Sequence, residues 1–227
     1  MPELLRIDAS YAPNGSVSRE LTGVFAKAWR DRGSEYTLVE RDLRTDPVPH
    51  FAHPALHWHP PLGEAPPADD ALREAARVQR SLVDELLAAD VLLIGAPMYN
   101  YSPPSTLRAW LDHVHVRGLT SAAERDTRPL RGRAAVIVAT RGTVHGPGTA
   151  NEHRDHAIPP LRLILGEEFG MEVTVVAVNR TLSASLPALA DERPAFEEER
   201  RTAAAHLIEL ARTVTRHAPQ DDRPDTD

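Results

Sequence analysis

The feature of the sequence that most constrains the fold is the stretch from Val91 to Leu107. It begins with an uninterrupted apolar run at residues 91–94 that stops at Gly95, and such a run is typical of a strand buried inside a parallel sheet. The residues after Pro97 are polar and rich in proline, which predicts a loop. Because open α/β sheets bind their ligands at the carboxyl ends of the strands, we expect this loop to line the functional site.

A helix is expected directly after that loop, ending near residue 116. Ser105 or Thr106 is positioned to cap its first turn. Its apolar side chains recur with the spacing of one helix face: Leu107, Trp110, Leu111 and Val114. The loop therefore joins a buried strand to an amphipathic helix.

The rest of the chain repeats this alternation of strand and helix. Further strands are predicted at residues 4–9, 36–40, 134–139 and 173–178. Further helices are predicted through residues 21–29, at about 68–89, from Pro159 and Pro160 in a first turn to about 169, and at about 191–216.

This alternation, with right-handed crossovers, predicts an α/β fold with a doubly wound five-stranded parallel sheet in the order 2-1-3-4-5 and helices on both faces. We predict one domain at residues 1–216, within which residues 44–67 form a covering loop. Residues 217–227 are polar and acidic and are expected to be a disordered tail.

The composition narrows the function. The chain has no cysteine, which excludes disulfides, thiolate metal sites and thiol catalysis, so redox chemistry would need a bound cofactor. A net charge of −7 gives no general attraction to nucleic acid or anionic lipid. No stretch approaches the roughly 20 apolar residues of a membrane span, and no cationic leader precedes the first strand. We therefore expect a cytoplasmic protein that binds neither nucleic acid nor membrane.

Hydroxyl side chains follow the first strand, at Ser10, Ser16 and Ser18. A junction from strand to helix presents free backbone N–H groups and the positive end of the helix dipole, so a phosphate monoester would fit there. The alternative is that Ser16 or Ser18 only caps the helix.

The covering loop carries four imidazoles within ten residues: His50, His53, His57 and His59. Their spacing does not match a helical metal-ligand pair and no Asp or Cys is interleaved, so we predict no metal site. With Phe51 and Trp58 the loop is instead expected to wall a pocket for a flat organic substrate.

Three loops are thus expected at one edge of the sheet. A ligand lying across them would place a phosphate at residues 10–18 and a planar ring between residues 98–101 and 140–145. This is the footprint of a mononucleotide with a large ring.

The motifs of these loops resemble the FMN-dependent NADH-azoreductase family, also described as NADH:quinone oxidoreductases, with a flavodoxin-like fold. The resemblance implies that FMN is held by Ser10, Ser16, Val17, Ser18, Pro97, Met98, Tyr99, Asn100, Tyr101, Thr140, Arg141, Gly142, Thr143 and His145. It further implies NADH or NADPH as electron donor, a small aromatic, quinone or azo acceptor, and a homodimer with its sites at the interface.

Within this resemblance, His145 and Tyr99 are the candidate catalytic residues, and the substrate pocket is assigned to Phe51, Trp58, Tyr101 and Ser121. The family commonly has glycine at the position of Thr143 and phenylalanine at the position of Ser121. The phosphate and ring loops therefore match the family better than the substrate side does. The altered substrate side would also suit a bulky aromatic metabolite, in which case the chain would be an enzyme of a specific pathway.

Several alternatives remain open from the sequence. His145 could be an ordinary loop residue, Arg141 could pair with a carboxylate instead of the cofactor, and Tyr99 could only shape the pocket. For the whole chain, the alternatives are a non-catalytic flavin carrier of the flavodoxin type and a metal-dependent hydrolase that uses the His-rich loop.

Overall fold

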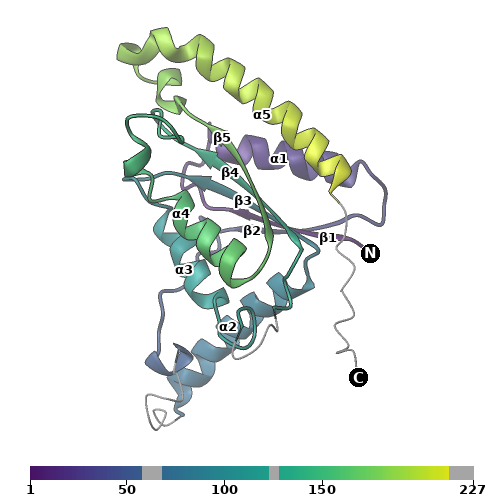
Figure 1. Ribbon diagram of the computed structural model, residues 1–227. Coiled ribbons are helices and arrows are strands. Elements are labelled where there is room, and N and C mark those ends of the chain that lie inside the picture. The colour runs from purple at the N-terminus through teal and green to yellow at the C-terminus, as the bar shows by residue number, and fades with distance from the viewer. Residues whose placement is uncertain (58–67, 123–127, 215–227) are drawn as a thin grey trace, which may run out of the picture.

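A computed structural model describes residues 1–57, 68–122 and 128–214. Five parallel strands form one sheet in the order β2-β1-β3-β4-β5, which confirms the predicted order (Figure 1). The strands are β1 (Glu3–Asp8), β2 (Thr37–Asp42), β3 (Val91–Pro97), β4 (Ala134–Thr140) and β5 (Glu172–Val178).

Helices cover both faces of this sheet, as Figure 1 shows. Those on one face are α1 (Val17–Arg30) and α5 (Arg193–Thr213), and those on the other are α2 (Asp70–Ala88), α3 (Ser105–Val114) and α4 (Ile158–Leu161). Short 3-10 helices are η1 (Pro54–His57), η3 (Glu152–Arg154), η5 (Thr181–Ala184) and η6 (Pro187–Glu192).

The central strand is β3, as its apolar run predicts. All seven of its residues are buried, and it pairs with β1 on one side and β4 on the other. A strand with neighbours on both edges and helices on both faces has no wet side, which is why its sequence does not alternate between polar and apolar residues.

The sheet separates two apolar clusters. Leu5 and Ile7 of β1 pack with residues of α2, α3 and α4, whereas Leu4 packs with residues of α1 and α5. Successive side chains of a strand point to opposite faces, so Arg6 and Asp8 lie on the same face as Leu4, beside α1. This places two charged side chains in an otherwise apolar layer.

Two local predictions are wrong. Pro104 is the cap of α3, which has no side-chain capping bond, so neither Ser105 nor Thr106 caps it. The proline fixes its own φ near −65°, which already suits the start of a helix. After α4, with Pro159 and Pro160 in its first turn as predicted, the chain continues as a π-helix, η4 (Arg162–Glu168), where an ordinary helix was expected.

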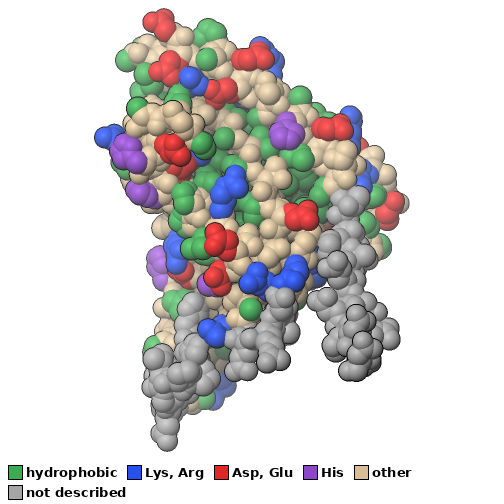
Figure 2. All heavy atoms as spheres, in the orientation of Figure 1, with side chains coloured by type: hydrophobic (Ala, Val, Ile, Leu, Met, Phe, Trp, Pro, Cys, Tyr) green, Lys and Arg blue, Asp and Glu red, His purple; other side chains and the backbone are tan. Residues whose placement is uncertain are grey.

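Part of the predicted organisation lies outside the described residues. Trp58, His59 and the tail at residues 217–227 belong to that part. Among the helices that are described, none combines the length and apolar character required to cross a bilayer. On the face drawn in Figure 2, acidic and basic side chains are interspersed.

Candidate active site

The carboxyl ends of β1, β3 and β4 meet at one edge of the sheet. Asp8 of β1 pairs with Gly95 of β3, and Pro97 of β3 pairs with Thr140 of β4. The N–H of Met98 then donates to the carbonyl of Thr140 over 2.8 Å. The three loops that carry the predicted site residues therefore start side by side.

The first loop ends in the cap of α1. Ser16 is the N-cap, and its Oγ accepts from the N–H of Arg19, so the capping role considered for this residue is confirmed. The Oγ atoms of Ser16 and Ser18 lie 3.2 Å apart. The N–H groups of Val17 and Ser18 belong to the first turn, where amides have no intrahelical acceptor. Hydroxyl and amide donors thus gather at the positive end of a 14-residue helix.

The second loop makes a tight turn at its tip. Tyr99 and Ser102 exchange two backbone hydrogen bonds, at 2.9 and 3.0 Å, and between them Asn100 and Tyr101 both have positive φ, 49° and 69°. The turn leaves the Tyr101 side chain 49% exposed. The Tyr99 hydroxyl lies 3.1 Å from Ser10 Oγ, which joins this loop to the first.

The third loop brings His145 to the same place. The His145 ring centroid lies 6.0 Å from that of Tyr101 in an edge-on arrangement. Its Nε2 is 2.9 Å from Thr143 Oγ1, and the residue is only 6% exposed. Its other ring nitrogen, Nδ1, is buried and has no hydrogen-bond partner among the described residues. A buried polar atom without a partner is costly and is common where a ligand supplies the partner.

Two residues of this loop are fixed by neighbouring elements. The Arg141 guanidinium is buried and lies 2.5 Å from a carboxylate oxygen of Asp155, which is the structural role considered for it. Gly142 is packed under Leu182, since a Cβ at Gly142 would lie 2.7 Å from Leu182 Cδ1. Arg141 therefore contributes to the candidate site by holding the loop, and its charge is directed at Asp155.

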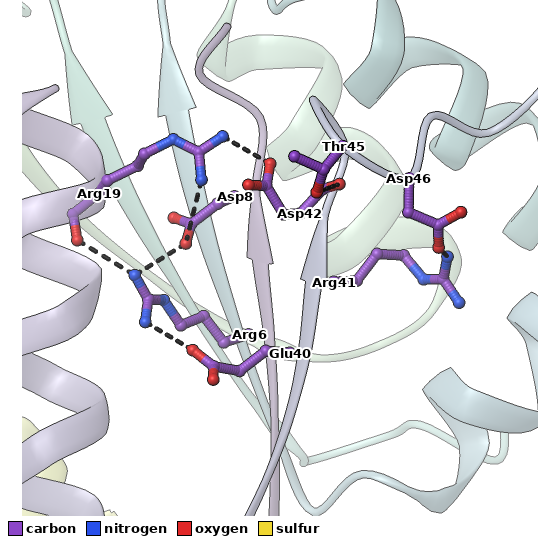
Figure 3. Close-up of a pocket in the computed structure, with 8 residues that line it drawn as sticks. All are labelled: Arg6, Asp8, Arg19, Glu40, Arg41, Asp42, Thr45 and Asp46. Carbon is purple, nitrogen blue, oxygen red and sulfur yellow. Dashed lines mark hydrogen bonds and ion pairs between the residues drawn. The ribbon is translucent and has the colours of Figure 1, made fainter. Parts of the chain in front are cut away.

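A partly buried ionic network lies beside the first loop (Figure 3). Asp8 lies 2.8 Å from Arg6 and accepts a hydrogen bond of 2.7 Å from Thr22. Arg19, on the first turn of α1, donates to the carbonyl of Ser10 over 2.5 Å and to Asp42 over 2.6 Å. The network therefore ties β1, β2 and α1 to the start of the candidate site.

Sequence reasoning missed this network. The signal for it was present, because Arg6 and Asp8 stand among apolar residues of a strand expected to be buried, and charges there must be paired. Asp155 was missed as well. It stands three residues before Ile158, and its Oδ1 accepts from the N–H groups of Ala157 and Ile158, a local pattern that favours an acidic cap.

The pKa values of Asp8 and Asp42 are shifted in opposite directions. Burial disfavours the charged form of Asp8 and raises its pKa, although Arg6, Thr22 and Arg19 act against this. Burial also opposes the ionisation of Asp42, but the hydrogen bonds from Arg19 and from the N–H of Arg44, with the charge of Arg19, lower its pKa overall. Asp42 is therefore ionised at neutral pH and is the anionic partner of Arg19.

A cavity of about 390 Å³ opens beside this network. It is lined by Arg6, Asp8, Arg19, Glu40, Arg41, Asp42, Thr45 and Asp46 (Figure 3). Seven of these eight side chains are charged, which does not suit a flat apolar ring. The predicted ring site lies instead at the second and third loops.

Phe51 and Ser121, which are assigned to the substrate pocket, contact residues at the C-terminal end of α3 and just after it. The Phe51 ring centroid is 4.9 Å from that of His113, near the C-terminal end of α3. Tyr101 precedes the opposite end of this helix, which has 10 residues and is about 15 Å long at 1.5 Å per residue. Ser121 is 3% exposed, and its carbonyl accepts from the N–H of Gly118. Their assignment to the pocket stays a prediction.

The metal alternative receives no support from the described part of the covering loop. His53 Nδ1 accepts from the N–H of Ala55. Within the described residues, no group of three or more His, Cys, Asp or Glu side chains is arranged to hold a metal ion.

The donors at this edge of the sheet fit FMN. Neutral hydroxyls and amides at the start of α1 can hold a phosphate without a basic side chain. The second and third loops combine the ring of Tyr99, the Met98 side chain and the unpartnered Nδ1 of His145, which suit a ring with an apolar face and polar edges.

Comparison with known proteins agrees with this geometry. A family model described as "Flavodoxin-like fold" matches residues 2–207. A protein of Kineococcus radiotolerans, named FMN-dependent NADH:quinone oxidoreductase, is 46% identical over 216 residues that cover 94% of this chain and 100% of that protein. One of the same name from Streptomyces coelicolor is 35% identical over 224 residues, covering 97% and 99%.

Solved structures share the fold. An azoreductase from Bacillus anthracis superposes with a TM-score of 0.77 at 19% identity, covering 93% of this chain and 99% of that one. An FMN-dependent NADH-azoreductase from the same species, in complex with FMN, gives 0.75 at 17% identity, covering 95% and 100%. On the family match and the full-length relatives, this chain belongs to the FMN-dependent NADH:quinone oxidoreductase family, with a flavodoxin-like fold.

Proposed function

We propose that this chain is an FMN-dependent oxidoreductase that takes two electrons from NADH or NADPH and passes them to a quinone, an azo compound or a related aromatic acceptor. The observation that carries the proposal is the contact of three strand-end loops, through Ser10 with Tyr99 and Tyr101 with His145. The nearly full-length relatives named FMN-dependent NADH:quinone oxidoreductase support it.

Each loop has a distinct role in this proposal. Ser10, Ser16 and Ser18, with the amides of the first turn of α1, would hold the phosphate and the ribityl chain. Residues 97–101 and 140–145 would hold the ring. Because no lysine or arginine is required at the phosphate, the helix dipole and the hydroxyls carry the attraction.

The redox chemistry would be that of FMN held by these loops, namely hydride transfer from the nicotinamide and delivery of two electrons to the acceptor. For a quinone, the balance is NAD(P)H, one proton and quinone giving NAD(P)⁺ and quinol. The protein positions the ring and stabilises the negative charge that develops on its polar edge. We assign that stabilisation to the amides at residues 142–145 and to His145, and the orientation of the second loop to Tyr99.

The substrate would lie against the exposed side of the ring. We assign Tyr101 to this side because the residue is 49% exposed and its ring contacts His145. Ser121 and the covering loop with Phe51 and Trp58 are proposed to complete the pocket, which a second copy of the chain would bring together.

A homodimer is therefore part of the proposal. Two aromatic residues are exposed beside the candidate site, Tyr11 at 68% and Tyr101 at 49%. Exposed apolar surface next to a functional site commonly marks an interface with a partner protein. Light scattering on the purified protein should give twice the chain mass of 25.0 kDa. A monomer at micromolar concentration would contradict this part.

The function is tested by anaerobic titration of the FMN-loaded protein with NADH and then NADPH. We expect the flavin absorbance to bleach with at least one nicotinamide and to return when a quinone or an azo dye is added. A yellow protein that stays oxidised with both nicotinamides would identify a flavodoxin-type carrier, and a protein that does not bind FMN would overturn the proposal. Activity that a chelator abolishes would favour the metal-dependent alternative.

A further inference from the structure

We propose that Thr143 is a positioning residue that selects the tautomer of His145, so that its Nδ1 carries the proton and presents a hydrogen-bond donor to the bound flavin. The inference rests on the proposed function for the identity of the ligand. The placement of the two side chains rests on the structure alone.

Only one of the two ring nitrogens of His145 has a hydrogen-bond partner among the described residues. Thr143 Oγ1 lies 2.9 Å from His145 Nε2, whereas His145 Nδ1 is buried with no hydrogen-bond partner among the described residues. With the His145 residue only 6% exposed, water does not reach the ring freely. Because the Thr143 hydroxyl is able to donate to Nε2 or to accept from it, the direction of this hydrogen bond decides which ring nitrogen carries the proton, and we assign the hydroxyl as the donor.

The loop holds both residues firmly in place. On the side before Thr143, the N–H of Arg141 donates to the carbonyl of Val178 over 2.9 Å. On the far side, Asn151 Nδ2 donates to the carbonyl of Val144 over 3.1 Å. The first bond ties the loop to β5 and the second ties it to Asn151, the N-cap of η3, so the backbone that carries the hydroxyl and the imidazole is held on both sides.

The chemistry follows from the donor count of a neutral imidazole. One ring nitrogen carries a proton and the other is an acceptor. When the Thr143 hydroxyl donates to Nε2, the proton must be on Nδ1. A buried N–H donor then has no acceptor until a ligand carbonyl supplies one, and a hydrogen bond in such a dry place is stronger than in water.

This arrangement favours the reduced flavin over the oxidised flavin. Reduction places negative charge on the polar edge of the ring, and a fixed N–H donor stabilises that charge more than it stabilises the neutral carbonyl. Without the Thr143 hydroxyl, the proton can move to Nε2, and Nδ1 becomes an acceptor that repels the same edge.

The first test reads the tautomer in the FMN-free protein. Nitrogen-15 NMR at neutral pH, with the His145 signals identified by their loss in His145→Gln, should show the proton on Nδ1. Thr143→Val, which replaces the hydroxyl by a methyl group at similar volume, should move it to Nε2, and Thr143→Ala should do the same. Thr143→Ser should restore it. An unchanged tautomer in Thr143→Val would overturn the proposal.

A control in the same loop separates this effect from general loosening. Thr149 Oγ1 donates to the carbonyl of Gly146 over 2.7 Å, so Thr149→Val removes a hydroxyl bond that does not involve His145. It should leave the His145 tautomer unchanged. A tautomer shift in Thr149→Val would show that the loop and not the Thr143 hydroxyl sets the proton position, which also overturns the proposal.

The second test measures the ratio of affinities for reduced and oxidised FMN. Thr143→Val should weaken binding of the reduced form about tenfold relative to the oxidised form, which lowers the two-electron midpoint potential by about 30 mV. Thr143→Ser should restore the potential. Equal potentials in Thr143→Val and the natural protein would overturn the proposal, whereas failure of the natural protein to bind FMN would overturn the proposed function and leave the tautomer measurement standing.

Discussion

The hydroxyl of Tyr99 lies 3.1 Å from Ser10 Oγ, and this contact joins the loop after β3 to the loop after β1. Tyr11 packs against the same ring at a tilt of 45°, with centroids 4.4 Å apart. The two loops come from strands that are neighbours in the sheet. Their tips are thus held together at the place where the phosphate end and the ring of a flavin would meet.

Tyr99→Phe should weaken FMN binding. The substitution keeps the ring and removes a side-chain hydrogen bond, which is worth about 1 kcal/mol or roughly fivefold in Kd. Fluorescence quenching of FMN on titration with apoprotein measures it. Tyr36→Phe is the matched control, because Tyr36 precedes β2 at the other edge of the sheet and packs edge-on against Trp29. Equal losses in both variants would contradict the role of the Ser10 contact.

Gly95→Ala should destabilise the protein by about 2 kcal/mol, the usual cost of overpacking a core. A Cβ at Gly95 would lie 2.9 Å from Asp8 Oδ1 and 3.2 Å from Thr22 Cγ2, so it would push on the buried ionic network. Urea unfolding measures the change. Gly146→Ala adds the same methyl group where nothing lies within 4 Å, and it should be close to neutral. If Gly95→Ala leaves the free energy of unfolding unchanged, Asp8 and Thr22 can move to make room for the methyl group, which contradicts this prediction.

Asp155→Asn should cost about 3 kcal/mol, because it leaves the Arg141 charge buried without its carboxylate. The two side chains are only 9% and 5% exposed. Thermal unfolding followed by circular dichroism measures the loss. The control is Asp112→Asn, whose partner Arg108 is 53% exposed, and it should change stability by less than about 1 kcal/mol. A loss confined to the control would contradict the assignment.

Asp42→Asn should lower stability at neutral pH but not in acid. Because the pKa of Asp42 is lowered in the folded state, its stabilising effect is present above the unfolded pKa of about 3.9 and is lost as the pH falls through the folded value. The expected cost at pH 7 is about 1 kcal/mol, after allowing for partial exposure.

Urea unfolding between pH 3 and pH 7 tests this dependence. Asp46→Asn is the control, since Asp46 is 76% exposed in its pair with Arg41, and its effect should be small throughout. A cost of Asp42→Asn that is the same at both ends of the range would contradict the lowered pKa.

The strand order could be predicted because each strand ends in a recognisable signal. The apolar run before Gly95 and the polar loop after Pro97 fixed the central strand and its functional edge. The π-helix after Leu161 could not be predicted, because its apolar residues have a spacing that an ordinary helix would also give. Helix register there depends on packing and not on local preference.

Some contacts of the candidate site could also be predicted from the sequence, and others could not. Ser10, Tyr99, Tyr101 and His145 could be placed near one another from the order of the strands, and their contacts confirm that placement. The pairing of Arg141 with Asp155 could not be chosen from the sequence, since the two are 14 positions apart in a connection whose path the residue pattern does not determine. The contact of Thr143 with His145 depends on side-chain direction within a loop, which residue spacing does not determine.

The left-handed backbone at Tyr101 has an evolutionary consequence. Positive φ costs a non-glycine residue about 1 kcal/mol, so glycine would be the more stable choice at this position. A laboratory selection for heat resistance alone should therefore replace the tyrosine early, and with it remove the aromatic side chain that we propose to face the acceptor. Selection for thermal stability and selection for catalytic activity would then favour different residues at position 101.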